Sequence, residues 1–457
     1  MTNARRSATT WSATTRSDTT RSDTTRSDLT RSTAGRTARR SAAVVTALAG
    51  ALAALLAPAA GAQAAPAGCR TVTTAPLDAE QARLQDARTA AFTERSGLAD
   101  LLHGFPAALC SARTADRAQR VVDSWGRKLW QAGLDRAQGR RPGGELPALD
   151  DRPLYWARLA MTVRLAQWQP RFDVDHAALR ARFEDASRGL GDGFADEPDP
   201  GVRRIFVSGF DPYGLDTEAR RANPSGAAVL QLHGQRITLA DGSTAEVRAV
   251  VLPVRYRDFD QGIVERAFGP HLEPGGPQSA DLITSISQGY PGTFTLEAWA
   301  GRARSADPAT DNLGALSGGT WQHPVDAPGL GDGPQFIRTT LPTDAMTAVQ
   351  QPYPVLLNTP VTEIPAGATD PVDRPDGPTP GSRAVAGGGG GYLSNEVAYR
   401  SNRLRLDLAP GLPGGHLHTP VLTGLPDQQD RVTSAEFEQN EAAIAAQVRA
   451  ILSSARL

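Results

Sequence analysis

The sequence predicts an α/β fold, a three-layer α/β/α sandwich with a mostly parallel sheet, preceded by a small all-α N-terminal domain. Apolar residues recur at helical spacing over residues 75–189, whereas after Gly201 short apolar runs alternate with helical segments. Nearly continuous apolar runs indicate strands that are buried on both faces, as in parallel sheets. The change of pattern near Gly201 therefore separates a helical part from an α/β part.

Residues 1–65 are expected to be a disordered leader followed by a secretory signal peptide. The pentapeptide TTRSD recurs from Thr14 to Asp28, and a basic pair at Arg39, an apolar run over 43–56 and the sequence AQA from Ala62 follow. A basic region, a short apolar run and a small-residue cleavage site are typical of a signal peptide. The run is too short and too rich in alanine for a confident membrane span. We therefore expect a secreted protein with no stable membrane span after cleavage, with both the Sec and the twin-arginine routes open.

Two cysteines, Cys69 and Cys110, follow the predicted signal peptide. In an exported chain such a pair indicates one disulfide, and the alternative is two unpaired thiols.

The formal charge of the 457 residues is −1, so no overall field attracts nucleic acid. No Cys/His cluster and no H-E-x-x-H motif occurs, so we expect no metal and no cofactor.

Residues 66–190 are expected to form the helical domain. Val122, Trp125 and Leu129 fall on one helical face and are best explained as core. No chemistry is visible in this part. Residues 191–202, rich in glycine, proline and acidic residues, are expected to be a linker.

Residues 203–457 are expected to form the α/β domain. The predicted strands cover 203–210, 247–254, 280–287, 353–360 and 415–422, and an amphipathic helix with a capping box at Thr433 and Glu436 closes the chain. In such sheets, binding sites form beyond the carboxyl ends of the strands.

Short motifs lie in those positions. They are VSGFDPYG from Val207, NPS from Asn223, LPVRY from Leu252, SQGYPGTFTLE from Ser287, AR at Ala303 with DN at Asp311, TLP from Thr340, GGYLSN from Gly390 and GHLHTP from Gly415. Together and in this order they resemble the pyroglutamyl peptidase I (pyrrolidone-carboxylate peptidase) family over residues 203–457.

The resemblance implies a catalytic triad and a substrate pocket. The family uses a cysteine, a histidine and a glutamate to remove N-terminal pyroglutamate from peptides. Its glutamate and histidine correspond to Glu297 and His418, whereas Ser394 stands where the family has its cysteine. The expected substrate-binding residues are Phe210, Tyr213, Gln288 and Arg304. Packing at a strand end is an equally good explanation for the two aromatic residues, and a surface ion pair is the commoner role of an arginine.

Three further expectations concern the surroundings of Ser394. The glycine run 387–391 is either a floppy linker or a turn that presents Ser394 at a helix N-terminus. His416 is expected to be structural and to face away from His418. The segments 313–335 and 361–389 are expected to be surface loops near the site.

Two functions follow. The first is an exported hydrolase that acts on pyroglutamyl peptides, or on a related small amide or ester, through Ser394, His418 and Glu297. The second is a catalytically inactive binding protein on the same scaffold. The oligomeric state stays open.

Overall fold

The computed structural model describes residues 69–195 and 199–457. Its centre is a seven-stranded sheet in the order β12-β7-β16-β6-β3-β5-β4. The strands are β3 (Val202–Phe210), β4 (Arg236–Thr238), β5 (Thr244–Leu252), β6 (Leu282–Gln288), β7 (Phe294–Glu297), β12 (Val355–Asn358) and β16 (Gly414–Thr419). The pairs β12–β7, β16–β6, β6–β3 and β3–β5 are parallel, and only β7–β16 and β4–β5 in this sheet are antiparallel.

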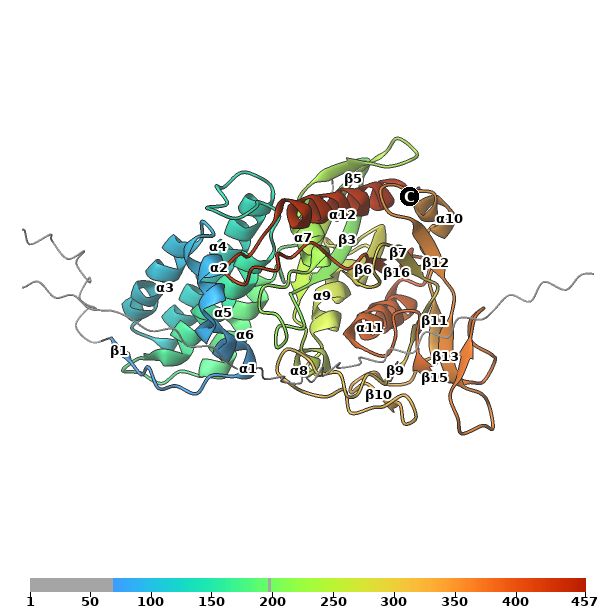
Figure 1. The fold of residues 1–457 in the computed structure, drawn as a ribbon, viewed down its shortest axis with the longest axis horizontal. Coiled ribbons are helices and arrows are strands. Elements are labelled where there is room, and N and C mark those ends of the chain that lie inside the picture. The colour runs from blue at the N-terminus through green and yellow to red at the C-terminus, as the bar shows by residue number, and fades with distance from the viewer. Residues whose placement is uncertain (1–68, 196–198) are drawn as a thin grey trace, which may run out of the picture. The chain divides into compact units, whose positions relative to one another are not determined.

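Helices cover both faces of the sheet (Figure 1). The helices α7 (Pro224–Leu232) and α12 (Ala435–Ser453) pack together on one face, and α9 (Ile263–Leu272) and α11 (Leu393–Leu408) pack together on the other. Strand β3 shows the reason. Its residues Ile205 and Val207 belong to the core on the side of α7 and α12, and Phe206 belongs to the core on the side of α9 and α11. Successive residues of a strand point to opposite faces, so a strand of apolar residues needs a helical layer on each side. The predicted α/β/α class is confirmed.

Polar caps fix the starts of the covering helices. Asn223 accepts a hydrogen bond from the Ser225 amide at the start of α7, and Pro224 occupies the first helical position, where its missing N–H costs nothing. At α12 the cap is Ser434, whose side chain accepts from the Phe437 amide. The capping box expected at Thr433 and Glu436 is therefore wrong by one residue.

The helical region, defined here as residues 79–188, contains α1 (Ala79–Ala82), α2 (Ala90–Glu94), α3 (Ala99–Ser111), α4 (Ala115–Ala137), α5 (Arg152–Gln167) and α6 (His176–Ser187), with short 3-10 turns at Arg83–Gln85 and Ala87–Thr89. The pair β1 (Arg70–Thr71) and β2 (Trp168–Gln169) borders it. Many of its apolar residues belong to the same core as α7, α12 and one face of the sheet, and a smaller cluster around Phe92 and Trp156 is separate. All described residues lie within one compact unit.

Cys69 and Cys110 are joined at the edge of this region. Their Cα atoms are 5.3 Å apart and their sequence separation is 41 residues, a Cα distance within the usual disulfide range. The leader and signal peptide expected over residues 1–65 lie outside the described residues. Among the helices that are described, none is both long enough and apolar enough to span a bilayer.

The remaining elements are short and lie outside the central sheet. They are α8 (Tyr256–Asp260), β8 (Trp299–Gly301), β9 (Ala303–Arg304), β10 (Val325–Asp326), β11 (Phe336–Arg338), α10 (Thr343–Thr347), β13 (Val361–Ile364), β14 (Val372–Arg374) and β15 (Arg383–Ala386). The loop expected over 361–389 is mostly a three-stranded antiparallel sheet, β14-β13-β15. Buried Glu363 holds it together by accepting from Arg374 and from the Thr379 amide and hydroxyl. In 313–335, β10 pairs with β9.

Candidate active site

A buried carboxylate–imidazole pair lies between two neighbouring strands. His418 Nδ1 of β16 is 2.8 Å from Glu297 Oε1 of β7, and both residues are buried. Strand β7 runs antiparallel to β16, and Thr295 is the direct cross-strand partner of His418. An imidazole that donates from Nδ1 to a carboxylate carries its free lone pair on Nε2, which can then accept a proton.

Two further donors hold the Glu297 carboxylate. Thr295 Oγ1 donates to Oε1 over 2.6 Å, and Asn358 Nδ2 at the end of β12 donates to Oε2 over 2.6 Å. The carboxylate is therefore oriented by neighbours on two strands as well as by His418. Sequence reasoning missed both donors, because Asn358 lies outside the motifs and the motif that contains Thr295 assigns it no role.

The glycine run forms a tight turn against this pair. Gly387 and Gly390 exchange backbone hydrogen bonds of 3.1 and 3.0 Å, which leaves Gly388 and Gly389 at the tip. A β-carbon on Gly388 would collide with Glu297 Oε2, and one on Gly389 would come 3.0 Å from His418 Cε1. Of the two explanations of the run, the structure therefore gives the turn, because only glycine fits so close to both side chains.

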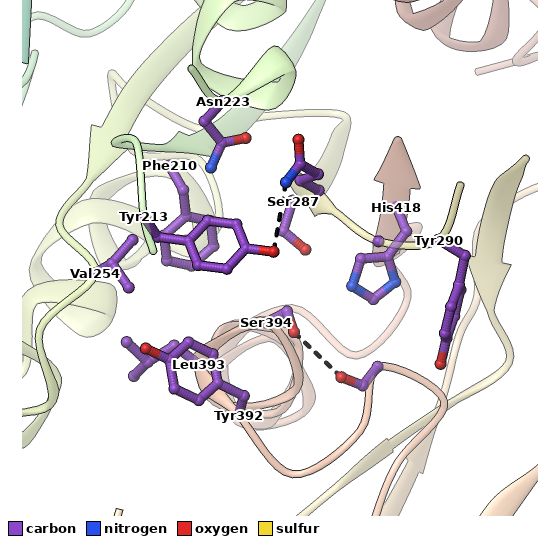
Figure 2. Close-up of a pocket in the computed structure, with 13 residues that line it drawn as sticks. Phe210, Tyr213, Asn223, Val254, Ser287, Tyr290, Tyr392, Leu393, Ser394 and His418 are labelled. Atoms are coloured by element: carbon purple, nitrogen blue, oxygen red, sulfur yellow. Dashed lines mark hydrogen bonds between the residues drawn. The ribbon is translucent and has the colours of Figure 1, made fainter. Parts of the chain in front are cut away.

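Ser394 follows the turn as the second residue of α11. Its Oγ donates to the carbonyl oxygen of Gly389 over 3.1 Å, and it faces the same cavity as the His418 ring (Figure 2). Within the described part of the chain, Ser394 and His418 form no direct hydrogen bond. The structure thus brings the three expected catalytic residues around one site, with the serine hydroxyl turned toward the glycine turn.

The cavity has a volume of about 220 Å³ and lies beyond the carboxyl ends of β3, β5, β6 and β16. Three expected substrate-binding residues line it, together with residues that the motifs did not single out. The lining consists of Phe210, Tyr213, Asn223, Val254, Ser287, Gln288, Gly289, Tyr290, Gly389, Tyr392, Leu393, Ser394 and His418. Among these described residues there is no carboxylate, lysine or arginine, so the cavity favours a small neutral ligand with an apolar face.

Polar groups at one end of the cavity are already paired with one another. Gln288 Nε2 donates to the Tyr213 hydroxyl over 3.4 Å, and Gln288 Oε1 accepts from the Leu422 amide over 3.1 Å. At the other end the Tyr290 ring meets the His418 ring edge-on at 6.3 Å between centroids. Burial raises the pKa of the Tyr290 hydroxyl, with a smaller contribution from Glu297, so Tyr290 is a neutral donor at ordinary pH.

Arg304 does not line this cavity, contrary to the expectation that it binds substrate. Its guanidinium is held by Glu396 through contacts of 2.6 and 2.7 Å and by Asp260 at 2.6 Å. It also stacks over the Tyr256 ring at 4.7 Å. With two carboxylates already bound, Arg304 instead fixes the first turns of α11, which carries Glu396.

His416 does not face away from His418. Residues two apart in a strand share a face, and the two ring centroids are 4.5 Å apart. The nitrogens of His416 are hydrogen-bonded to the Ser285 and Ser287 hydroxyls at 2.7 and 2.8 Å. Burial lowers the pKa of His416 well below its ordinary value, and the neighbouring His418 adds to this. His416 is therefore a neutral support beside the His418 imidazole.

One group of acidic side chains in the described residues is close enough to share an ion. It consists of Asp150, Asp151 and Glu441, none of which lines the cavity. The expectation that the protein needs no metal and no cofactor stays a prediction.

Comparisons with known proteins find relatives for both the helical region and the α/β part of this chain. A family model described as the PA0049 N-terminal domain matches residues 61–185, and one described as the PA0049 C-terminal domain matches 204–325 and 354–423. The uncharacterized protein PA0049 of Pseudomonas aeruginosa is 34% identical over 430 residues, covering 74% of this chain and 77% of that protein. This chain belongs to the PA0049 family.

Solved structures that resemble this PA0049-family member are pyrrolidone carboxyl peptidases. A mutant enzyme from Pyrococcus furiosus is 21% identical, with a TM-score of 0.35, over 55% of this chain and 97% of that chain. Pyroglutamyl peptidase I from Bacillus amyloliquefaciens is 18% identical, with a TM-score of 0.35, over 56% of this chain and all of that chain. Similarity at this level gives no evidence on what a PA0049-family protein cleaves or binds.

Proposed function

We propose that this PA0049-family protein is an exported hydrolase that removes N-terminal pyroglutamate from peptides, or cleaves a related amide or ester, through Ser394, His418 and Glu297. The observation that carries the proposal is the buried Glu297–His418 pair, with its 2.8 Å contact, beside a cavity that Ser394 also lines. A carboxylate, an imidazole and a hydroxyl around one small cavity are the parts that a serine hydrolase needs.

In the proposed reaction, Ser394 first turns about its Cα–Cβ bond, so that its hydroxyl leaves Gly389 and meets His418 Nε2. The imidazole takes the hydroxyl proton while Oγ bonds to the substrate carbonyl carbon, and Glu297 stabilises the imidazolium. His418 then gives that proton to the leaving amine as the C–N bond breaks. Water hydrolyses the acyl ester by the same steps in reverse order, which regenerates Ser394.

The oxyanion of the tetrahedral intermediate is stabilised by the N-terminus of α11. Ser394 is the second residue of this helix, and the first amides of a helix have no carbonyl partner within it. Those N–H groups would donate hydrogen bonds to the oxyanion beside Ser394, and the positive end of the helix dipole would stabilise its negative charge.

The substrate class follows from the motif resemblance and from the cavity. A lactam ring is flat, neutral and amide-bearing. Phe210 and Tyr213 offer aromatic surface to such a ring, and Gln288 offers an amide partner. The lining has no charged partner for a free N-terminal amine, so a pyroglutamyl end suits the cavity better than an ordinary N-terminus does.

A second function, binding without turnover, is favoured by one observation. The Ser394 hydroxyl is engaged with Gly389 and is not hydrogen-bonded to the base within the described residues. A serine held in this way would leave a cavity that binds a small neutral group and does not react with it.

Release of 4-nitroaniline from L-pyroglutamyl-4-nitroanilide by the purified mature protein separates the two functions. Turnover that Ser394→Ala and His418→Ala both abolish supports the hydrolase. His103→Ala, on the exposed surface of α3, is the matched histidine control and should keep full turnover. No turnover in the wild type, together with calorimetric binding of L-pyroglutamate, would support the binding protein.

A further inference from the structure

Six charged side chains are buried where the helical region meets the sheet. Three are acidic and three basic, so their formal charges sum to zero. They are Glu80, Arg158, Glu184, Arg188, Asp211 and Arg255, and each is at most 6% exposed. Charges removed from water are tolerated only when they are paired. The pairing pattern therefore shows which parts of the chain depend on one another.

Two arginines of the helical region hold one carboxylate of the α/β part. Arg158 Nη1 of α5 is 2.9 Å from Asp211 Oδ1, and Arg188 Nη1, at the end of α6, is 2.5 Å from Asp211 Oδ2. Arg188 also donates to the Val251 carbonyl oxygen over 3.3 Å. Each oxygen of Asp211 thus has its own guanidinium.

Two carboxylates of the helical region hold one guanidinium in return. Arg255 pairs with Glu80 of α1 at 3.0 Å and with Glu184 of α6. Arg188 also reaches Glu184 at 3.4 Å, which joins the two halves of the cluster. The Tyr155 hydroxyl also donates a hydrogen bond to Glu80.

The two residues held in this way sit directly beside the cavity wall. Asp211 follows Phe210 and precedes Tyr213 by two positions, and Arg255 follows Val254. Phe210, Tyr213 and Val254 all line the cavity. The charged side chains of the helical region therefore bind two residues, Asp211 and Arg255, that are close neighbours along the chain of three residues of the cavity wall.

We propose that the helical region is a built-in support for the binding cavity, with Arg158 and Arg188 as positioning residues that fix the Phe210–Tyr213 wall through Asp211. The expected effect on ligand binding rests on the proposed function, whereas the expected effect on the order of the cavity wall does not. The helical region, in which no catalytic motif is visible, thereby influences which ligands the cavity binds.

Hydrogen exchange in the full mature protein tests the support without any ligand. Arg188→Gln removes one partner of Asp211, and we expect amides of residues 208–215 to exchange at least about tenfold faster than in the wild type. Arg188→Lys keeps a charge within reach of Asp211 and should restore most of the protection. Arg136→Gln is the control, because this buried arginine donates to the Ser96, Ala148 and Asp150 carbonyl oxygens inside the helical region.

Equal exchange of residues 208–215 in Arg188→Gln and Arg136→Gln would overturn the proposal, since both variants remove a buried charge and differ in what that charge holds. If Arg188→Gln does not fold, Arg158→Gln removes the other guanidinium from Asp211 and leaves Arg188 in place, and unchanged exchange there would again overturn the proposal. If the wild type turns over pyroglutamyl-4-nitroanilide, Arg188→Gln should raise KM about tenfold and change kcat less than threefold. A wild type without turnover would defeat the proposed hydrolase and leave the exchange result decisive for the support.

Discussion

The hydroxyl of Ser394 donates to the carbonyl oxygen of Gly389 over 3.1 Å, and both residues line the same cavity as His418. The nucleophile proposed for the reaction is thus held by the turn that also packs against Glu297 and His418. Attack on a substrate requires this hydrogen bond to break, and the chemistry of the atom at position 394 decides how readily the base can activate it.

Ser394→Cys should increase turnover of pyroglutamyl substrates about tenfold, because a thiol beside an imidazole ionises near neutral pH and the longer C–S bond reaches further. The variant should also become sensitive to iodoacetamide. The described residues contain no free cysteine, so any inactivation reports on position 394. Initial rates with and without iodoacetamide measure both effects, and Ser394→Ala sets the background. A drop in turnover would mean that the site has been adapted to oxygen.

Gly388→Ala should lower kcat/KM on the order of 100-fold, since the added methyl collides with Glu297 Oε2 and displaces the carboxylate from His418. Gly411→Ala is the control, because a β-carbon there meets nothing within 4 Å. Kinetics together with a thermal melt separate a misplaced carboxylate from an unfolded protein. Equal kinetics for the two alanine variants would show that the turn does not position Glu297.

Substrates with a free N-terminal amine should react at least about 100-fold more slowly than their pyroglutamyl counterparts, because an ammonium group entering this cavity loses hydration without gaining a charged partner. Parallel measurement of kcat/KM for L-glutamyl- and L-pyroglutamyl-4-nitroanilide provides the comparison. Equal values would contradict the roles of Phe210, Tyr213 and Gln288 and leave the catalytic residues unaffected.

Protein recovered from culture medium should begin near Ala65 and carry an oxidised Cys69–Cys110 pair. Intact mass before and after reduction tests both expectations. The bridge closes a loop with a sequence separation of 41 residues, for which the chain-entropy model gives about 4 kcal/mol of unfolding free energy. A Cys69→Ser, Cys110→Ser double variant should lose stability on that order in urea titrations. An intact leader or two alkylatable thiols would contradict the export prediction.

The stability of the protein should fall as the pH rises from about 4.5 toward about 8, because burial, and next the charge of Asp150, raise the pKa of Glu441 from 4.5 to about 8. A carboxyl whose pKa is higher in the folded state binds its proton more tightly there, so its contribution is complete below the ordinary pKa of a glutamate and is fully lost once the pH has passed the folded pKa. Melting temperatures at about pH 6 and about pH 9 should therefore differ more in the wild type than in Glu441→Gln. The same difference in both proteins would show that another group controls the change.

Much of the fold could be predicted because its signals are local. Five strands of the sheet were visible as apolar runs, although β12 is exposed at Leu356 and Leu357. The motifs located Glu297, Ser394 and His418 at one site. The strand β7 was missed because its four residues form too short a run. Asn358 was missed as a partner of Glu297 because strand order and register bring it there, and Thr295 was missed because a hydrogen bond between two side chains of one strand leaves no mark in the motif that contains both.

Other differences arose where tertiary contacts outweigh a local pattern. Arg304 has the position that the motif resemblance implies, yet Glu396 and Asp260 bind its guanidinium. The segment 361–389 is rich in proline and glycine, which suggested a loop, but Glu363 gives its strands a buried polar centre. The hydrogen-bond partners of Arg304 and of Glu363 cannot be predicted from the composition of the sequence around them.

The core shared by the helical region and the sheet has a consequence for synthesis. The ribosome releases the N-terminal helices first, and the face of α4 that packs on α7 stays uncovered until residues 224–232 emerge. Helix α12 packs on α7 in turn, and its residues, 435–453, emerge after every strand of the sheet. The nascent chain must therefore keep the apolar faces of α4 and α7 from aggregating until these later segments have been synthesised. Loss of α12 would leave the face of α7 that it covers exposed permanently.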